Sequence, residues 1–228
     1  TRFISMVSHE FRTPMTGMQA SAALLRRLGD RLTLEKQHQH LENIENALRR
    51  MNRLLDDVLF FSRAESRKLK VSRKETHLPD HLAEVIETLN PIYPDRRVEL
   101  DTSGLKHPVQ PLDIHLLDHI LHNLLGNALK YSPVTTPVTC HISEDPDGLS
   151  FSITDQGIGI PEADQKKLFE AFHRAGNVGT RQGTGLGLNI ALRAVELLEG
   201  TLTFISQQDS GSTFTVHLPH PSGKTQSP

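Results

Sequence analysis

The chain has 228 residues, of which 36% are hydrophobic and 23% charged, and its formal net charge is -2. This length suits one large domain or two modest ones, and the composition is that of a soluble globular protein. No basic stripe is present, which argues against nucleic acid as a partner. Cys140 is the single cysteine, so an intrachain disulfide is excluded.

The sequence contains no membrane-crossing signal. No apolar run approaches the roughly 20 residues needed to cross a bilayer, and no signal peptide is evident. We therefore expect a cytoplasmic fragment that makes no membrane contact itself. The chain begins inside an already periodic pattern and without Met, which indicates a piece of a longer protein. Whether that longer protein is membrane-anchored stays open.

Two helical segments open the chain. Their apolar residues follow steps of three and four, a pattern typical of helices in a bundle or coiled coil. These residues are Ile4, Val7, Phe11, Met18, Ala22 and Leu25, then Leu34, Leu41, Ile44, Leu48, Met51, Leu55 and Val58. Gly29-Asp30 and a predicted N-cap, Thr33, separate the two segments. The pattern predicts an antiparallel helical hairpin over residues 1–67, which two chains would complete as a four-helix bundle.

From about residue 68 the pattern changes to short alternating strands with helices between them. Helices are expected near 79–89, 113–131 and 185–199, and strands around 98–100, 138–142, 151–153, 202–204 and 214–218. Turn sequences at 145–148 and 208–211 join neighbouring strands. We expect a linker at 68–78, an α/β two-layer sandwich over 79–220 and a disordered tail at 221–228. The predicted fold class is therefore α+β with two domains.

One histidine on the first helix has the setting of a nucleophile. His9 projects about 200° round the helix from Val7, and Thr13 shares its face one turn away. The neighbouring Glu10 can hold the Nδ1 proton and leave Nε2 to attack. Taken alone, the pattern is more typical of an ordinary surface histidine. A metalloprotease site is excluded, because no second histidine follows four residues later.

The run Ser8-His9-Glu10-Phe11-Arg12-Thr13-Pro14 resembles the phosphoacceptor box of two-component sensor histidine kinases. In that family this helix opens a dimerising hairpin, and the histidine takes the γ-phosphoryl group of ATP. The resemblance implies that Glu10 assists His9. It also implies that Thr13 positions a water molecule that dephosphorylates a partner protein.

A second constellation lies in the α/β half. The run from His122 to Tyr131 resembles the asparagine box of the same family, and its Asn123, Asn127 and Lys130 fall on one helical face. Two amide oxygens and a cation placed there can hold Mg²⁺ and a polyphosphate. The resemblance therefore makes Asn123 and Asn127 the candidate metal ligands and adds Tyr131 to the nucleotide site. Without the resemblance, a polar helix face with no ligand is the simpler interpretation.

Two glycine-rich segments follow. The run 155–161 comes after a predicted strand and resembles the first glycine box, in which Asp155 would accept a hydrogen bond from the adenine amino group. Gly157 and Gly159 let the backbone pass close to a nucleotide. The run 183–188 precedes a helix and resembles the second glycine box, whose N–H groups can cradle phosphates. Its site residues are Gly183, Thr184, Gly185, Leu186 and Gly187. A dinucleotide fold is disfavoured, because the glycines do not follow the first strand of a βαβ unit.

Residues 168–174 resemble the phenylalanine box, although His173 stands where the family often has an aromatic residue. By resemblance this segment and residues 175–182 form a lid over ATP, and Arg174 is a candidate contact to the γ-phosphate. All five boxes occur in the family's order. Metal binding by the other histidines is conceivable but disfavoured, because no cysteine or acidic partner completes a ligand set. These histidines are His77, His81, His115, His119 and His122.

The resemblance implies a homodimer that binds ATP and Mg²⁺ and phosphorylates its own His9. The phosphoryl group would then pass to an aspartate of a response-regulator receiver domain, with phosphatase activity toward that domain as a further possibility. One alternative is a GHKL-type ATPase like Hsp90, gyrase or MutL. Those enzymes carry a catalytic Glu where Asn123 stands, and an amide cannot take a proton. The other alternative is a dimerisation scaffold without catalysis.

Overall fold

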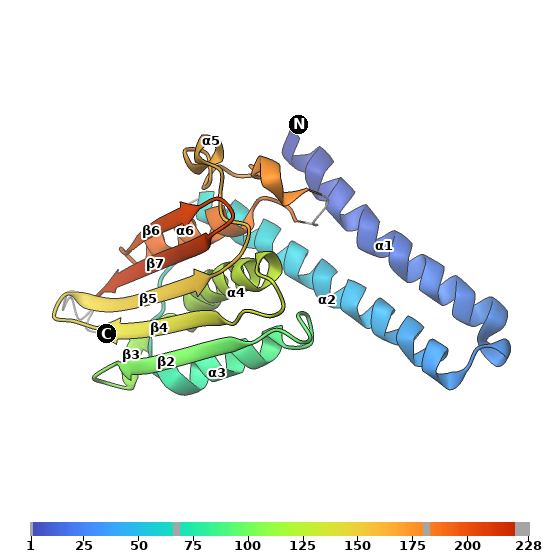
Figure 1. Cartoon of the computed structure of the whole chain (residues 1–228), viewed down its shortest axis with the longest axis horizontal. Helices are drawn as coiled ribbons and strands as arrows, with labels where there is room; N and C mark the ends of the chain where they lie inside the picture. The colour runs from blue at the N-terminus through green and yellow to red at the C-terminus, as the bar shows by residue number, and fades with distance from the viewer. Residues whose placement is uncertain (1, 66–68, 180–182, 222–228) are drawn as a thin grey trace. The chain divides into compact units, whose positions relative to one another are not determined.

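The computed structural model describes residues 2–65, 69–179 and 183–221, apart from the side chains of residues 2–6, 9, 30 and 65. The chain divides into two compact units (Figure 1). One consists of residues 1–68 with 182–184, and the other of residues 69–181 with 185–228. The tail predicted at 221–228 lies, beyond residue 221, outside the described residues. No helix in the described ranges is both long and apolar enough to span a membrane.

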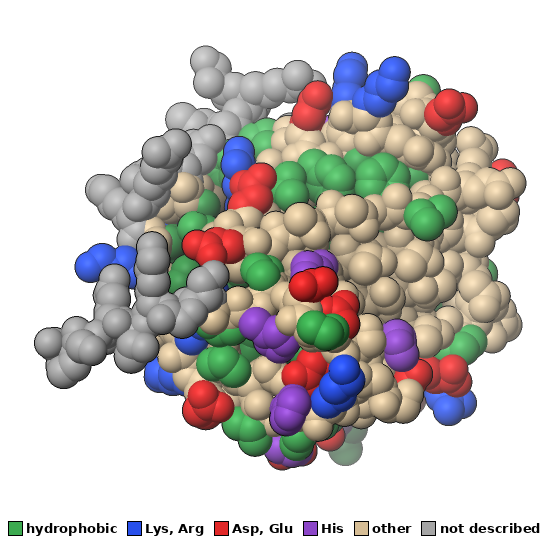
Figure 2. Space-filling view, turned by 90° about the vertical axis from the view of Figure 1, so that its left-hand side faces the viewer, with side chains coloured by type: hydrophobic (Ala, Val, Ile, Leu, Met, Phe, Trp, Pro, Cys, Tyr) green, Lys and Arg blue, Asp and Glu red, His purple; other side chains and the backbone are tan. Residues whose placement is uncertain are grey.

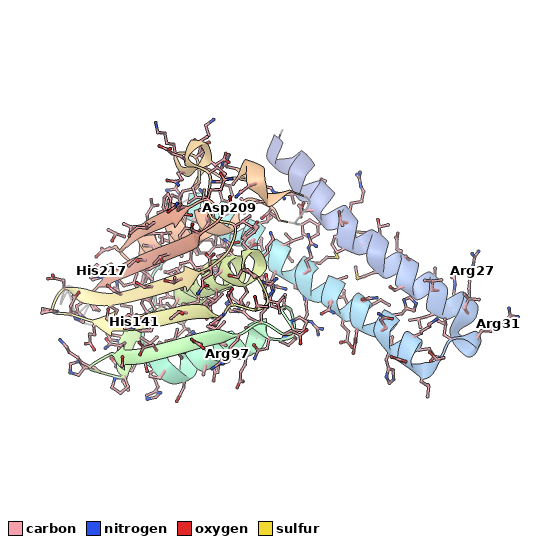
Figure 3. All side chains as sticks on the ribbon, in the orientation of Figure 1. Arg27, Arg31, Arg97, His141, Asp209 and His217 are labelled. Atoms are coloured by element: carbon pink, nitrogen blue, oxygen red, sulfur yellow. The ribbon has the colours of Figure 1, made fainter. Side chains whose placement is uncertain are left out.

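The first unit is a helical hairpin, as predicted. Helix α1 spans Arg2–Leu28, a short 3-10 turn η1 spans Gly29–Arg31, and α2 spans Leu34–Glu65. The turn is held by the Gln37 side-chain amide, which donates to the Gly29 carbonyl at 2.6 Å. Thr33 Oγ1 accepts from the Lys36 N–H at 3.4 Å, as an N-cap does. Arg27 and Arg31 mark the turn end of the hairpin in Figure 3.

The apolar seam of α2 divides into two rows. Ile44, Met51 and Val58 are half-buried. A second row, seven residues apart, stays in solvent: Leu34 is 72% exposed, Leu41 49%, Leu48 48% and Leu55 49%. Leucines at strict heptad spacing on an exposed stripe are typical of a helix that packs against further helices.

The second unit is built on a five-stranded mixed sheet in the order β2-β4-β5-β7-β6. Its strands are β2 (Val98–Gly104), β4 (Val138–Glu144), β5 (Gly148–Asp155), β6 (Thr201–Gln207) and β7 (Gly211–Pro219). β2 and β4 run parallel, and the other neighbours are antiparallel. The predicted turns join β4 to β5 and β6 to β7. In the first of them, Asp145 Oδ1 accepts from the N–H groups of Asp147 and Gly148.

Three helices cover one face of this sheet (Figure 1): α3 (Leu78–Leu89), α4 (Ile114–Tyr131) and α6 (Gly187–Leu197). The inward residues alternate along the strands, as in Val138, Cys140 and Ile142, and are fully buried. Burial raises the pKa of the Cys140 thiol to about 12, so this cysteine stays protonated and unreactive at neutral pH. A helical hairpin followed by a two-layer α/β domain was the predicted fold class, and it is confirmed.

The outward face of the sheet is polar. Ser152 and Thr154 of β5 hydrogen-bond to Thr215 and Thr213 of β7 across the strands. On the face shown in Figure 2, histidine side chains lie among acidic ones. In this unit several histidines lie within 3 Å of a carboxylate oxygen: His141 of Asp101, His107 of Glu144, His77 of Asp80 and His81 of Asp118.

A second, two-stranded sheet joins residues 74–77 to residues 109–112. The antiparallel strands are β1 (Lys74–His77) and β3 (Val109–Leu112). The segment taken as a linker from the sequence therefore contains a strand. Just before it, the Ser72 N–H donates to Asp113 Oδ2 at 2.6 Å, while Asp113 Oδ1 caps the N-terminus of α4.

Candidate active site

Helix α4 carries the polar face predicted from the sequence. Its other side is buried among the sheet and neighbouring helices, whereas Asn123, Asn127 and Lys130 are half-buried. The Asn123 amide Nδ2 donates to the His119 carbonyl at 2.7 Å, which fixes the orientation of its oxygen. The Lys130 ammonium lies 4.7 Å from the centroid of the Tyr131 ring. This face of α4 thus presents the amide oxygen of Asn123 and, two turns further along the helix, the cation of Lys130.

The C-terminal end of α4 is held by a residue that the sequence analysis did not single out. Arg96 donates to the carbonyl of Leu129 and, at 2.6 Å, to that of Ser132. These carbonyls belong to the end of the helix, where no intrahelical N–H is left for them and a cation is favoured by the helix dipole. Arg96 therefore stabilises the turn that carries Lys130 and Tyr131.

Asp155 ends β5 beside this turn. Its side chain is buried, and Oδ1 accepts from the Gly157 N–H at 2.7 Å. Burial raises the pKa of the Asp155 carboxyl above its usual value, and the N–H groups of Gly157 and Ser212 partly oppose that shift. A buried carboxylate at a strand end is a specific acceptor for an amino group.

Gly157 is required here by close packing. A Cβ at this position would lie 2.7 Å from both Asp155 Oδ1 and the Tyr131 carbonyl oxygen, which is closer than Cβ atoms approach other heavy atoms. The first glycine segment therefore runs directly against the end of α4. Gly159 follows with φ 58°, and Gly185 of the second glycine segment has φ 71°, left-handed conformations that favour glycine.

The second glycine segment brings the start of α6 to Asn123. A Cβ on Gly187 would lie 2.5 Å from Asn123 Oδ1. Leu186 is fully buried and fixes the segment, whereas Gly183 and Thr184 precede it without regular secondary structure. The first turn of α6 therefore lies against the Asn123 side chain, and a helix N-terminus is a favourable place for an anion.

Residues 168–179 are tied to both glycine segments. The Phe172 N–H donates to the Gly185 carbonyl at 2.9 Å. The Asn177 amide donates to the carbonyls of Ile158 and Gly159 at 3.3 and 3.0 Å. Asn189 of α6 donates to the Phe169 carbonyl at 2.8 Å. This segment is the one predicted as a lid, and its part at 180–182 lies outside the described residues.

His173 and Arg174 of this segment each contact a neighbouring group. His173 Nε2 lies 3.3 Å from Asp164 Oδ1, while Asp164 Oδ2 accepts from the Gly176 N–H at 2.8 Å. Arg174 is exposed and its guanidinium donates to the Gly179 carbonyl at 3.4 Å. The role of Arg174 toward a γ-phosphate stays a prediction.

In the hairpin, His9 lies within α1, and its side chain is outside the part that the structure describes. Thr13 is exposed, as predicted for a residue one turn along. Glu10 is mostly covered, and its Oε2 lies 3.2 Å from Nη2 of Arg50 on α2. Sequence reasoning missed Arg50, because the pair joins residues 40 positions apart.

Comparison with known proteins matches two family models to the two units. Residues 1–67 match the His Kinase A (phospho-acceptor) domain, and residues 112–222 match the histidine kinase-, DNA gyrase B- and HSP90-like ATPase family. The curated relatives include the sensory/regulatory protein RpfC of Xanthomonas campestris pv. campestris, 35% identical over 96% of this chain and 31% of the relative. The signal transduction histidine-protein kinase BarA of Escherichia coli is also 35% identical, over 96% of this chain and 24% of the relative.

Two solved structures share the fold. ShkA, crystallised full-length in complex with AMPPNP, is 27% identical with a TM-score of 0.66, over 96% of this chain and 45% of ShkA. The histidine kinase AdeS of Acinetobacter baumannii has the same TM-score at 22% identity, over 93% of this chain and 98% of AdeS. The chain therefore belongs to the two-component sensor histidine kinases, as a catalytic core with a phosphoacceptor hairpin and an ATPase-type domain. It spans about a third or less of the curated relatives quoted above.

Proposed function

We propose that the chain binds Mg-ATP in the α/β unit and phosphorylates its own His9. The observation that carries the proposal is the convergence of three segments far apart in sequence. The Asp155–Gly157 turn packs on the end of α4, and Gly187 of α6 packs on Asn123 of the same helix. One polar face is thereby bordered by a buried carboxylate, amide groups and a helix N-terminus.

The residues present fit a magnesium nucleotide. Asp155 would accept a hydrogen bond from the adenine amino group. The Asn123 oxygen, oriented by the bond from Nδ2 to His119, is a hard oxygen donor of the kind that Mg²⁺ prefers. Asn127 on the next turn would be its companion ligand. When bound, Mg²⁺ would supply charge neutralisation on the phosphates, and Lys130 and the first N–H groups of α6 would add to it.

At the hairpin, Nε2 of His9 would form a bond to the γ-phosphorus as the bond from that phosphorus to the bridging oxygen of ADP breaks. Glu10 would take the Nδ1 proton of the imidazole. The phosphohistidine would then donate its phosphoryl group to an aspartate of a receiver domain, and Thr13 would orient a water for the reverse loss of phosphate from that domain. These later steps rest on the family alone.

An ATPase that hydrolyses its nucleotide is less well supported. Water attack needs a general base, and the amide at Asn123 cannot accept a proton. A scaffold without catalysis is disfavoured, because every candidate catalytic residue of the family's boxes is present in the sequence. Dimerisation is supported by the exposed leucine row of α2.

The test is incubation with ATP labelled on the γ-phosphate, comparing His9→Ala with the wild-type chain. We expect acid-labile label on wild-type protein, none on the variant, and equal nucleotide binding by both. His38→Ala is the matched control, an exposed histidine of the same hairpin. Label that persists in His9→Ala, or release of free phosphate without labelled protein, would contradict the proposal.

A further inference from the structure

A partly buried ion pair crosses the hairpin at Glu10, the residue that follows the candidate phosphoacceptor His9. Glu10 of α1 and Arg50 of α2 meet at 3.2 Å, with side chains 15% and 30% exposed. The neighbouring Arg49 behaves differently, because it turns to Glu45 and Asn46 one turn away on its own helix, where the side chains are half-exposed or more. Arg50 therefore ties the two helices together at the position of Glu10.

Glu10 needs such a partner. It is the residue next to His9 in the chain, and most of its side chain is removed from water. Covering an ionised carboxylate is costly unless a donor replaces the lost water. The planar guanidinium of Arg50 supplies that donor in a fixed geometry, which a flexible ammonium group does less well. Arg50 thereby determines where the Glu10 carboxylate lies.

The pair leaves the carboxylate able to act. The contact with Arg50 uses Oε2 of Glu10, and a carboxylate offers about four acceptor positions over its two oxygens, so one ion pair does not exhaust its acceptor capacity. The ion pair would therefore hold the Glu10 side chain in place without preventing it from taking the Nδ1 proton assigned to it in the proposed function.

We propose that Arg50 is a positioning residue for histidine phosphorylation, acting through Glu10. The inference rests on the proposed function, because it concerns the rate at which His9 receives the phosphoryl group. A carboxylate that is free to change rotamer would be beside the imidazole for only part of the time. Since small displacements of a catalytic group lower rates strongly, the loss of Arg50 lowers the turnover of the reaction and leaves nucleotide binding unchanged.

The experiment measures initial rates of His9 labelling in the full chain at several ATP concentrations. We expect Arg50→Ala to lower the maximal rate about tenfold or more at an unchanged KM for ATP. Arg50→Lys should recover part of the loss, and Arg49→Ala should label like the wild type. In a Glu10→Gln background, Arg50→Ala should have no additional effect, because the group that it positions is already disabled.

Two outcomes would overturn the inference. The first is labelling of Arg50→Ala at the rate of Arg49→Ala. The second is the same fold loss in the Glu10→Gln background, which would mean that Arg50 serves the fold and not Glu10. Absence of label on the wild-type chain would instead remove the proposed function and the inference with it. Thermal unfolding followed by circular dichroism identifies any variant whose helices are lost, and Arg50→Lys then provides the measurement.

Discussion

Shortening two leucines on the exposed row of α2 should weaken the predicted homodimer. Leu41 and Leu48 are 49% and 48% exposed, so about half of each side chain is left for a partner to cover. Full burial of a leucine side chain contributes about 1.5–3 kcal/mol, and half of that is roughly 1 kcal/mol. In a two-fold dimer each position occurs twice, which gives roughly 2 kcal/mol per substitution.

The double variant Leu41→Ala/Leu48→Ala should therefore lose roughly 4 kcal/mol of dimer stability, a rise of about three orders of magnitude in the dissociation constant. Sedimentation equilibrium measures that constant. Ile205→Ala is the control, because Ile205 is 81% exposed on β6 of the other unit. If the double variant dimerises as tightly as this control, the leucine row is not the dimer interface. In the same assay we expect the isolated segment 1–67 to dimerise and 79–220 to be monomeric.

Asp155→Asn should weaken binding of ATP more than binding of a purine nucleotide without the 6-amino group. The two losses of binding free energy should differ by about 1.5–3 kcal/mol, and calorimetry with both nucleotides measures them. Because burial raises the pKa of Asp155, ATP affinity should fall with decreasing pH sooner than an ordinary aspartate would allow. Thr13→Ala should keep His9 labelling and lose dephosphorylation of the receiver, followed as decay of the phosphorylated receiver. Burial opposes ionisation of Glu144, but hydrogen bonds led by that of His107 lower its pKa from 4.5 to about 2. Glu144 therefore contributes stability that is present above pH 4.5 and lost as the pH falls toward 2, and Glu144→Gln should flatten this dependence in acid unfolding.

Each of these three expectations has a contrary outcome. Equal losses of affinity for both nucleotides would show that Asp155 does not recognise the base. A parallel fall in labelling and in dephosphorylation would give Thr13 a role in the helix near Pro14, and wild-type phosphatase activity must be measured first. If the stability of Glu144→Gln fell with decreasing pH as steeply as that of the wild type, other carboxylates would be responsible for the loss of stability in acid.

The sequence predicts those parts of the fold whose signal is local. Heptad spacing identifies both hairpin helices, and alternation identifies the five strands of the main sheet. Strand β1 is not predicted from the sequence, because Lys74–His77 has no apolar alternation and is largely exposed. Strand β3 is not predicted either, because Pro111 lies inside it and proline normally disfavours a strand.

The candidate site likewise contains residues that local sequence signals identify and residues that they do not. Asp155 and the glycines are marked by a strand, a turn and their own residue types, so motif reasoning finds them. Arg50, Arg96 and Asn177 act on atoms 40, 33 to 36 and 18 to 19 positions away. Nothing in their immediate sequence indicates those partners. Their roles follow only from the way in which the chain brings distant segments together.

The bond between the Ser72 N–H and Asp113 bears on how the two units work as one enzyme. α2 ends at Glu65, and the chain is held again at Ser72 by the N-cap of α4, so residues 66–71 connect these two points along the chain. Such a stretch spans at most about 25 Å when fully extended. A covalent connection this short corresponds to an effective concentration in the millimolar range for a reaction between the two units. Labelling of His9 should thus follow first-order kinetics at any dilution that preserves the dimer. Long Gly/Ser insertions into residues 66–71 should slow the labelling roughly as the −3/2 power of the length of this connection.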